Sequence, residues 1–165
     1  MWTVIKFDRK EFEFLKKDFE KFFGKDIKIY VPKLFFQRYK KNRIVIKEFN
    51  LLGDYLFCFH DKFKNPQIIN SLKFTRGLKY FLNGFTDSQE EINKFIKKCK
   101  DSEDRNGYLT QNFFDLCVNS SYEFTSGPCT EKIFRIIDLQ KNKINILLGN
   151  IKININKKKF LFRPV

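Results

Sequence analysis

A stretch of strict alternation near the C-terminus, KINILLGNIKININ at residues 143–156, restricts the fold of this chain more than any other part. Apolar residues occupy every second position on both sides of Gly149 and Asn150, and most of them are isoleucine. Side chains of a strand point alternately to opposite faces, and β-branched residues lose side-chain freedom in a helix. The stretch therefore predicts two strands joined by a tight turn.

The same period of two extends back to about Ser120 and includes Phe134, Ile136 and Ile137. A small barrel fits such a run of short strands and turns, because closure removes exposed strand edges. We therefore predict a β-barrel domain over residues 120–165. Before it, KDSEDRNG is charged and aperiodic, so residues 101–119 are predicted to be a linker, with one helical turn in LTQNFFDL.

Both strand and helix periods occur in the N-terminal part of the chain. Its predicted strands are TVIKF, DIKIYVP, IVIKEFNLL, YLFCF and LKYFL, with the exposed basic connection RYKKNR before the third. Helices are indicated by cap signals ahead of apolar residues at helical spacing. The signals are Asp8 with Glu11, Asn65 with Pro66, and Ser88 with Glu91. This order predicts an α+β domain over residues 1–100.

The charge of the chain favours a polyanionic partner such as nucleic acid. Lys and Arg outnumber Asp and Glu by 33 to 19, which gives a formal net charge of +14. Phe, Lys, Asn and Ile are also residues of A/T-rich codons. Genome composition is therefore an alternative source of part of the charge.

Cysteine and histidine usage predicts neither a metal site nor a disulfide framework. The four cysteines form no C-x-x-C pair, and His60 is the only histidine. No apolar run approaches the roughly 18 residues of a membrane span, so a cytoplasmic protein with reduced thiols and no cofactor is expected. An enzyme that uses Cys58 or Cys99 with His60 as the base is an alternative, and Cys58 shares strand parity with His60. A buried structural cysteine is favoured.

With these elements placed, the sequence resembles the NusG family of transcription elongation factors, and within it the specialised RfaH-like paralogs. WTV at 2–4 is similar to the family's aromatic first strand, and YVP at 30–32 to the Val-Pro end of its second strand. LLGDYLFC at 51–58 resembles the family's FFPGYVLV and the paralogs' LFPNYLFV. TRGLKYFL resembles the segment with a glycine before the last strand of the domain. SGPCTEK is similar to the GPF opening of the KOW motif.

The resemblance implies a non-enzymatic, monomeric factor with two domains. The first is an NGN-like antiparallel sheet with flanking helices, and the second is an SH3-like KOW barrel. In the family, an apolar patch of the NGN domain docks on the clamp helices of the largest RNA polymerase subunit. Carried over by motif, the patch here is Leu51, Leu52, Tyr55, Leu78 and Phe81. An ordinary role in the sheet core is the alternative for Leu51, Tyr55 and Phe57.

The resemblance also implies DNA contact, because family members carry a variable hairpin near upstream DNA at the position of the basic run. Cations there bind phosphate in a salt-sensitive, sequence-independent way, and a tyrosine can stack on a base. A solvated hairpin tip is the alternative. Including a weaker second group near residue 76, the candidate nucleic-acid-binding residues are Lys33, Arg38, Tyr39, Lys40, Lys41, Arg43, Arg76 and Lys79.

In family members the loop at the position of LLGN binds a small-subunit ribosomal protein or the termination factor Rho. The partner-binding residues expected here are Leu147, Leu148, Gly149 and Asn150. A tight hairpin turn also needs residues that tolerate positive φ, which is a structural reason for the last two. RfaH-like members can refold this domain as a helical hairpin, but the isoleucine alternation favours a resting barrel. A general RNA-binding or ribosome-associated KOW-type module is the alternative function.

Overall fold

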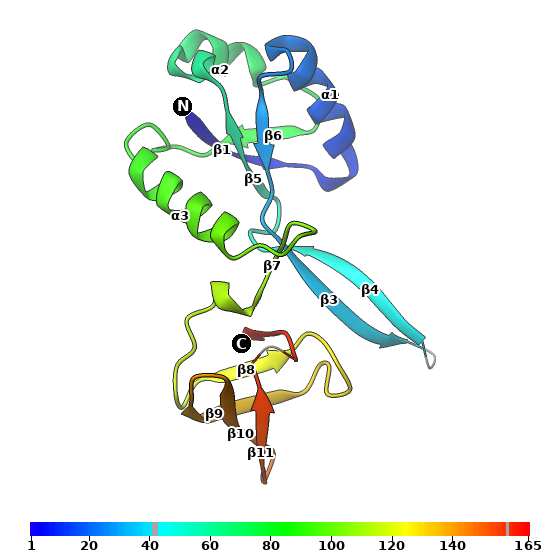
Figure 1. The fold of residues 1–165 in the computed structure, drawn as a ribbon. Helices are drawn as coiled ribbons and strands as arrows, with labels where there is room; N and C mark the ends of the chain where they lie inside the picture. Colours follow the sequence, from blue (N-terminus) through cyan, green and yellow to red (C-terminus); the bar gives the residue numbers. More distant parts are fainter. Residues whose placement is uncertain (41–42, 158) are drawn as a thin grey trace. The chain divides into compact units, whose positions relative to one another are not determined.

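The computed structural model describes residues 1–40, 43–157 and 159–165, without the side chains of Arg38, Tyr39, Lys40 and Ile44. Its architecture mixes helices and sheets, as the sequence predicted (Figure 1). The chain divides into two compact units. The first unit comprises Met1–Pro32 and Asn50–Lys98, and the second unit comprises Lys33–Phe49 and Cys99–Val165.

The first unit is built on a four-stranded antiparallel sheet with the strand order β2-β5-β1-β6. These strands are β1 (Trp2–Phe7), β2 (Lys28–Tyr30), β5 (Tyr55–Phe59) and β6 (Leu78–Phe81). The central strand β1 is apolar on both faces, because Ile5 and Phe7 point to one side and Trp2 and Val4 to the other. Both faces of the sheet are therefore covered.

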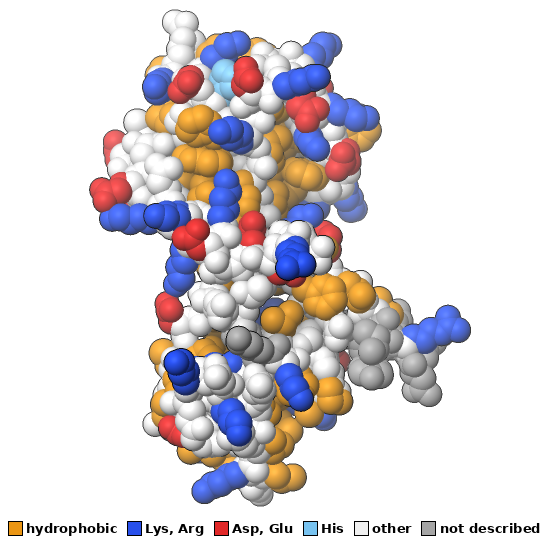
Figure 2. Space-filling model, in the orientation of Figure 1, with side chains coloured by type: hydrophobic (Ala, Val, Ile, Leu, Met, Phe, Trp, Pro, Cys, Tyr) orange, Lys and Arg blue, Asp and Glu red, His pale blue; other side chains and the backbone are white. Residues whose placement is uncertain are grey.

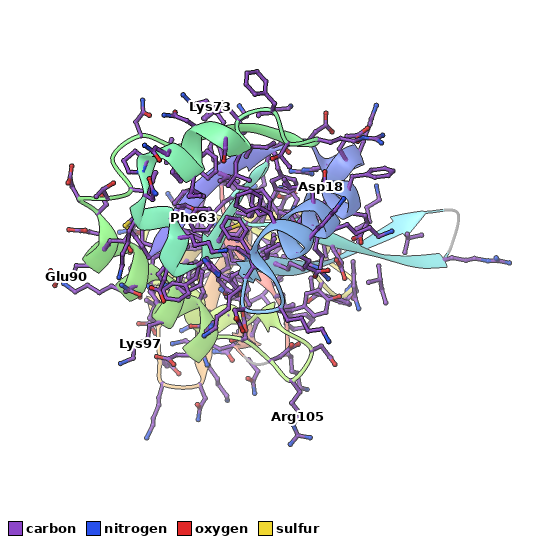
Figure 3. All side chains as sticks on the ribbon, turned by 90° about the horizontal axis from the view of Figure 1, so that it is seen from above. Asp18, Phe63, Lys73, Glu90, Lys97 and Arg105 are labelled. Atoms are coloured by element: carbon purple, nitrogen blue, oxygen red, sulfur yellow. The ribbon has the colours of Figure 1, made fainter. Side chains whose placement is uncertain are left out.

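Helices pack on the two faces in different numbers. The helices are α1 (Phe12–Phe23), α2 (Pro66–Leu72) and α3 (Gln89–Asp101), with single 3-10 turns η1 (Arg9–Glu11) and η2 (Asp61–Lys64). Leu15 and Phe19 of α1 and Leu72 of α2 share one core with the sheet, and Ile92 and Ile96 of α3 share the other. Viewed from above in Figure 3, Glu90 and Lys97 of α3 point away from the sheet.

The predicted cap signals are confirmed for two helix starts. The Asp8 carboxylate accepts a hydrogen bond from the Lys10 amide, and the Asn65 side chain accepts one from the Gln67 amide, each at 2.9 Å. Glu11 differs from the prediction, because its carboxylate binds Arg76 across the unit.

Gln89, at the start of α3, holds that helix to the sheet. Its side-chain Oε1 accepts from the Trp2 amide at 2.9 Å, and its Nε2 donates to the Trp2 carbonyl at 2.7 Å. The same Nε2 lies 2.6 Å from the Phe85 carbonyl. The amide thus takes the place of a neighbouring strand beside Trp2.

We expect Gln89→Ala to lower the free energy of unfolding by about 2 kcal/mol, because partly buried backbone groups of Trp2 lose their partners. Asn93→Ala is a suitable control, since Asn93 is exposed and donates to a single carbonyl, that of Gln89. Urea unfolding of both variants measures the effect. Equal losses in the two variants would contradict the anchoring role of Gln89.

The second unit contains a five-stranded antiparallel sheet, the C-terminal sheet, with the order β11-β10-β9-β8-β12. Its strands are β8 (Ser121–Phe124), β9 (Ile133–Leu139), β10 (Lys143–Leu148), β11 (Ile151–Asn156) and β12 (Phe162–Pro164). The predicted strands and the turn at Gly149 are confirmed, and Phe134, Ile136, Ile144 and Ile146 form its core. Since the order ends at β11 and β12, closure into a barrel stays a prediction.

A second, three-stranded sheet of this unit has the order β4-β3-β7. Its strands are β3 (Lys33–Lys40), β4 (Arg43–Asn50) and β7 (Tyr108–Leu109). We call β3 and β4 the hairpin. The prediction of RYKKNR as a connection is wrong for most of its length, because β3 continues to Lys40 and β4 begins at Arg43.

The predicted linker over 101–119 is also structured in part. The Asp104 carboxylate accepts from the amides of Asn106 and Tyr108, and β7 then pairs in parallel with β3. The predicted helical turn is present as the 3-10 turn η3 (Gln111–Phe113). The unit boundaries thus differ from 1–100 and 120–165, since the hairpin groups with the C-terminal sheet. That residues 1–100 and 120–165 fold as two independent domains stays a prediction.

Candidate functional site

An apolar groove of about 530 Å³ lies on the face of the first unit's sheet that carries α3. Figure 2 shows hydrophobic side chains gathered on the visible face of this unit, with charged side chains around them. The groove is open to solvent, and most of its lining residues also belong to the core that α3 completes on this face or pack against that core. Its lining residues are Val4, Leu52, Tyr55, Phe57, Leu82, Glu91, Ile92 and Phe95.

The turn between β4 and β5 presents two predicted docking residues to this groove. Leu52 and Tyr55 flank Gly53 and Asp54, and the Tyr55 amide donates to the Leu52 carbonyl at 3.2 Å. Gly53 has a φ of +63°, which favours glycine at this position. Arg9 fixes the turn through a 2.6 Å ion pair with Asp54. The motif LLGDYLFC therefore aims both apolar side chains at one surface.

Tyr55 also belongs to a small aromatic and cationic cluster at the edge of the groove. Its hydroxyl is hydrogen-bonded to the Tyr80 hydroxyl at 2.8 Å. The hydrogen bond to Tyr80 raises the pKa of Tyr55 above its usual range. The Lys6 ammonium lies 5.5 Å and 5.7 Å from the two ring centroids, within cation–π range.

The structure does not bring all five predicted docking residues together. Leu78 is buried in the core with α1 and α2, and Phe81 packs against the same core, on the opposite face of the sheet from the groove. Their neighbours Tyr80 and Leu82 are the more exposed residues of this segment. Leu51 is half-buried in the turn, where its amide donates to the Pro32 carbonyl.

Sequence reasoning missed several groove residues, namely Val4, Leu82, Ile92 and Phe95. Ile92 and Phe95 lie on the apolar face of the helix that Ser88 and Glu91 indicate in the sequence. The sequence of β1 could have indicated them. A strand with apolar residues at both odd and even positions needs a covering layer on each face of its sheet. α3 supplies that second layer.

The predicted nucleic-acid-binding residues lie on three elements. Arg38, Tyr39 and Lys40 are in β3, Arg43 is exposed at the start of β4, and Lys41 lies outside the described residues. The Lys33 ammonium is paired with the Glu48 carboxylate at 3.0 Å. Lys33, Arg38, Tyr39, Lys40 and Arg43 therefore lie in the hairpin, and their contact with nucleic acid stays a prediction.

Arg76 and Lys79 belong to the first unit and have different surroundings. The Arg76 guanidinium binds Glu11 and lies 3.7 Å from the ring centroid of Phe14, whereas Lys79 is exposed on β6. The hydrogen bond that Arg76 donates to Glu11 raises the pKa of Arg76. Its charge is therefore balanced by a carboxylate before any phosphate is bound.

Glu48 joins the base of the hairpin to β7. Its carboxylate accepts hydrogen bonds from the Tyr108 hydroxyl and from Lys33. The bond from Tyr108, followed by that from Lys33, lowers the pKa of Glu48 below its usual range. A carboxyl group with a lowered pKa stabilises the fold above its unfolded pKa, and this contribution is lost as the pH falls through the folded pKa.

We expect Tyr108→Phe to raise the pKa of Glu48 towards its ordinary value, because the larger of the two stabilising hydrogen bonds is removed. Lys33→Met is expected to shift the pKa in the same direction by less. NMR titration of the Glu48 side-chain carboxyl between pH 2 and 7 measures both. An unchanged pKa in Tyr108→Phe would contradict the contact.

The predicted partner-binding loop is the β10–β11 turn. Leu147 and Leu148 end β10, and Leu148 packs against the core of the C-terminal sheet. Gly149 has a φ of +59°, and Asn150 is exposed beside it. The turn accounts for Gly149, and contact of this loop with a partner stays a prediction.

Cys58 and His60 occupy structural positions. Cys58 is fully buried in the first core, and burial raises the pKa of its thiol far above the usual range. His60 accepts a hydrogen bond from the Lys62 amide through Nδ1 and packs 4.7 Å from the ring of Phe23. A thiol that stays protonated is a poor nucleophile, so this pair lacks the activation that catalysis needs.

Among the described residues, no three His, Cys, Asp or Glu side chains gather as a metal site. Nor does any helix within residues 1–40, 43–157 and 159–165 have the length and hydropathy to cross a bilayer.

Comparison with known proteins gives a limited result. The sequence matches no family model and no curated protein. A crystal structure of the archaeal MjSpt4:Spt5 complex, conformation B, has a TM-score of 0.33 at 12% identity, covering 100% of this chain and 98% of that chain. The structure of domain interaction in Thermotoga maritima NusG has a TM-score of 0.34 at 12% identity, covering 94% and 91%. Similarity at this level assigns no role to any residue here.

Proposed function

We propose that this protein is a transcription elongation or antitermination factor that docks on RNA polymerase through the groove of its first unit. The observation that carries the proposal is that Leu52 and Tyr55, taken from the motif LLGDYLFC, line one open apolar groove. Contiguous exposed apolar surface of this kind marks interaction sites on soluble domains. The occupant is an amphipathic helical element, for which the sequence resemblance supplies the clamp helices of the largest subunit.

In this proposal, the groove provides most of the binding energy for RNA polymerase. The basic residues orient the protein on its partner. Buried aromatic anchors such as Tyr55 dominate binding energy at protein interfaces. Charged residues at the rim, such as Lys6 and Glu91, act mainly on the rate of association and on orientation. Leu78 and Phe81 contribute through folding, since they belong to the core.

The hairpin is proposed to contact DNA in the transcription complex. Arg43 is exposed there, and Arg38, Lys40 and Lys41 belong to the same segment of the sequence. Contacts of this type depend on phosphate charge and not on base identity. The partner of the loop at Leu147–Asn150 is proposed to be a ribosomal protein or Rho, as the resemblance implies.

Neutralising the hairpin with Lys40→Gln and Lys41→Gln is expected to weaken duplex DNA binding equally for unrelated sequences. The slope of log K against log salt should fall by about 2, because about 0.9 counterion is released for each phosphate contact. Fluorescence anisotropy at four salt concentrations measures the slope. Lys97→Gln with Lys100→Gln on α3 is a matched control, and an equal fall in that control would assign the effect to net charge alone.

A general RNA-binding or ribosome-associated module is the second candidate, favoured by the net charge of +14 together with the strand-rich C-terminal sheet. The two candidates differ in their binding partner. The experiment titrates the labelled full chain with core RNA polymerase and, separately, with a 20-nucleotide RNA. Saturable polymerase binding that survives moderate salt supports the elongation factor. Binding to RNA alone, with a steep salt dependence, supports the alternative.

A further inference from the structure

The hairpin and the C-terminal sheet are joined inside the second unit by contacts that lie far apart in the sequence. The Gln37 amide, in β3, donates to the Thr125 carbonyl at 2.8 Å. The Gly127 amide returns a bond to the Gln37 side-chain Oε1 at 3.2 Å. Gln37 therefore binds the end of β8 through both its backbone and its side chain.

Arg163, in β12, adds cation–π contacts to this connection. Its guanidinium lies 5.9 Å from the ring centroid of Phe36 in β3 and 5.6 Å from that of Phe49 in β4. Glu123 also binds the guanidinium, with its Oε2 accepting from two Arg163 nitrogens at 3.0 Å and 2.7 Å. Lysine has no planar group with two such donors, so it does not reproduce this arrangement near the two rings.

We call the contact of the hairpin with segment 109–114 and β12 the seam, and its side chains are closely packed. Residues of the hairpin, of the segment 109–114 and of β12 line a remaining cavity of about 10 Å³, which is at most the space of one water molecule. Gln111 completes it, because its Oε1 accepts from the Phe162 amide at 2.8 Å. A seam of this kind is a packed contact and has no room for a ligand.

We propose that Gln37 and Arg163 are positioning residues that fix the hairpin to the C-terminal sheet, so that the two move as one body. The inference rests on the proposed function where it assigns nucleic-acid contact to the hairpin. A hairpin that is already held in place pays less ordering entropy when it binds. It also keeps a constant geometry relative to the partner loop at Leu147–Asn150, since both belong to the second unit.

The first test is amide hydrogen exchange on the full chain, with Arg163→Lys as the variant. Lysine keeps the positive charge and loses the planar guanidinium with its two hydrogen bonds to Glu123, so the Gln37 and Gly127 amides are expected to lose about tenfold of their protection. The Ile136 amide, which donates to Ser120 within the C-terminal sheet, should stay unchanged. Arg135→Lys, at an exposed position of β9, is the matched control. The inference would be overturned if the Gln37 amide of the wild type showed no protection from exchange. It would also be overturned if the protection of the Gln37 and Gly127 amides were unchanged in Arg163→Lys.

The second test measures binding of a fluorescein-labelled 20-base-pair duplex of mixed sequence. Arg163→Lys is expected to raise the Kd about fivefold with an unchanged salt slope, because the net charge is kept. Lost protection with unchanged DNA affinity would overturn the positioning role. If the wild type itself does not bind the duplex, nucleic-acid contact fails, and with it the positioning role for that contact. In that case, the protection of the Gln37 and Gly127 amides still tests whether Arg163 fixes the hairpin to the C-terminal sheet.

Discussion

Tyr55→Ala is expected to weaken binding to core RNA polymerase by about 2 kcal/mol, or about 30-fold in Kd. The ring lines an open groove, and its hydroxyl is held by Tyr80 at 2.8 Å, so the side chain is ordered before a partner arrives. An aromatic side chain fixed in this way loses little further entropy on binding. Truncation removes the ring without removing a strand contact, because β5 pairs with β1 through its backbone.

Two further variants separate the possible causes of this loss. Tyr55→Phe keeps the ring and removes the bond to Tyr80, so it should lose much less affinity than Tyr55→Ala. Phe74→Ala is the control for an aromatic residue outside the groove, since Phe74 is 95% exposed. Isothermal titration gives the affinities, and urea unfolding gives the stabilities. If Tyr55→Ala loses stability and keeps its affinity, the ring belongs to the core and the docking assignment is wrong.

Gly77→Ala is expected to lower the free energy of unfolding of the first unit by about 3 kcal/mol. Gly77 has a φ of +82°, and a Cβ placed on it would lie 2.9 Å from both the Cβ and the carbonyl oxygen of Glu11. The Gly77 carbonyl also accepts from the Asp8 amide at 2.8 Å. The segment cannot move away from the start of α1 without breaking that bond.

Gly84→Ala isolates the steric part of this loss. Gly84 has a similar φ of +80°, but a Cβ there would meet nothing within 4 Å. We expect it to cost about 1 kcal/mol, from the left-handed backbone alone. Thermal and urea unfolding of both variants give the difference. Equal losses would show that the approach to Glu11 is unimportant.

Local signals in the sequence were sufficient for most elements of the first unit. Asp8 and Asn65 cap the helix starts as their side-chain chemistry requires, and Gly149 sits where a tight turn needs positive φ. Gly77 was identified only through its motif, and the structure supplies the reason in its approach to Glu11. The two caps and the turn at Gly149 depend on neighbours within a few residues or on backbone conformation, whereas the approach of Gly77 to Glu11 depends on the fold.

Features that depend on long-range pairing were not predictable in the same way. Strand β3 was missed because KLFFQRYK lacks alternation, and it forms through pairing with β4 and β7. Leu78 and Phe81 are three residues apart, and regular alternation would put them on opposite faces. The register shift between β6 and β1 turns both towards the core with α1 and α2, and such a bulge leaves no pattern in the sequence. The contact of Gln37 with Thr125 spans most of the chain and leaves no local pattern.

The most direct test of the central claim is co-purification of the tagged full chain with RNA polymerase from cell extract. It is done at moderate salt, with nuclease added to remove bridging nucleic acid. The proposed function predicts that polymerase is retained by the wild type and by Phe74→Ala, and is largely lost from Tyr55→Ala. Absence of polymerase from the nuclease-treated wild-type sample, with RNA or ribosomes retained only when nuclease is omitted, would contradict it.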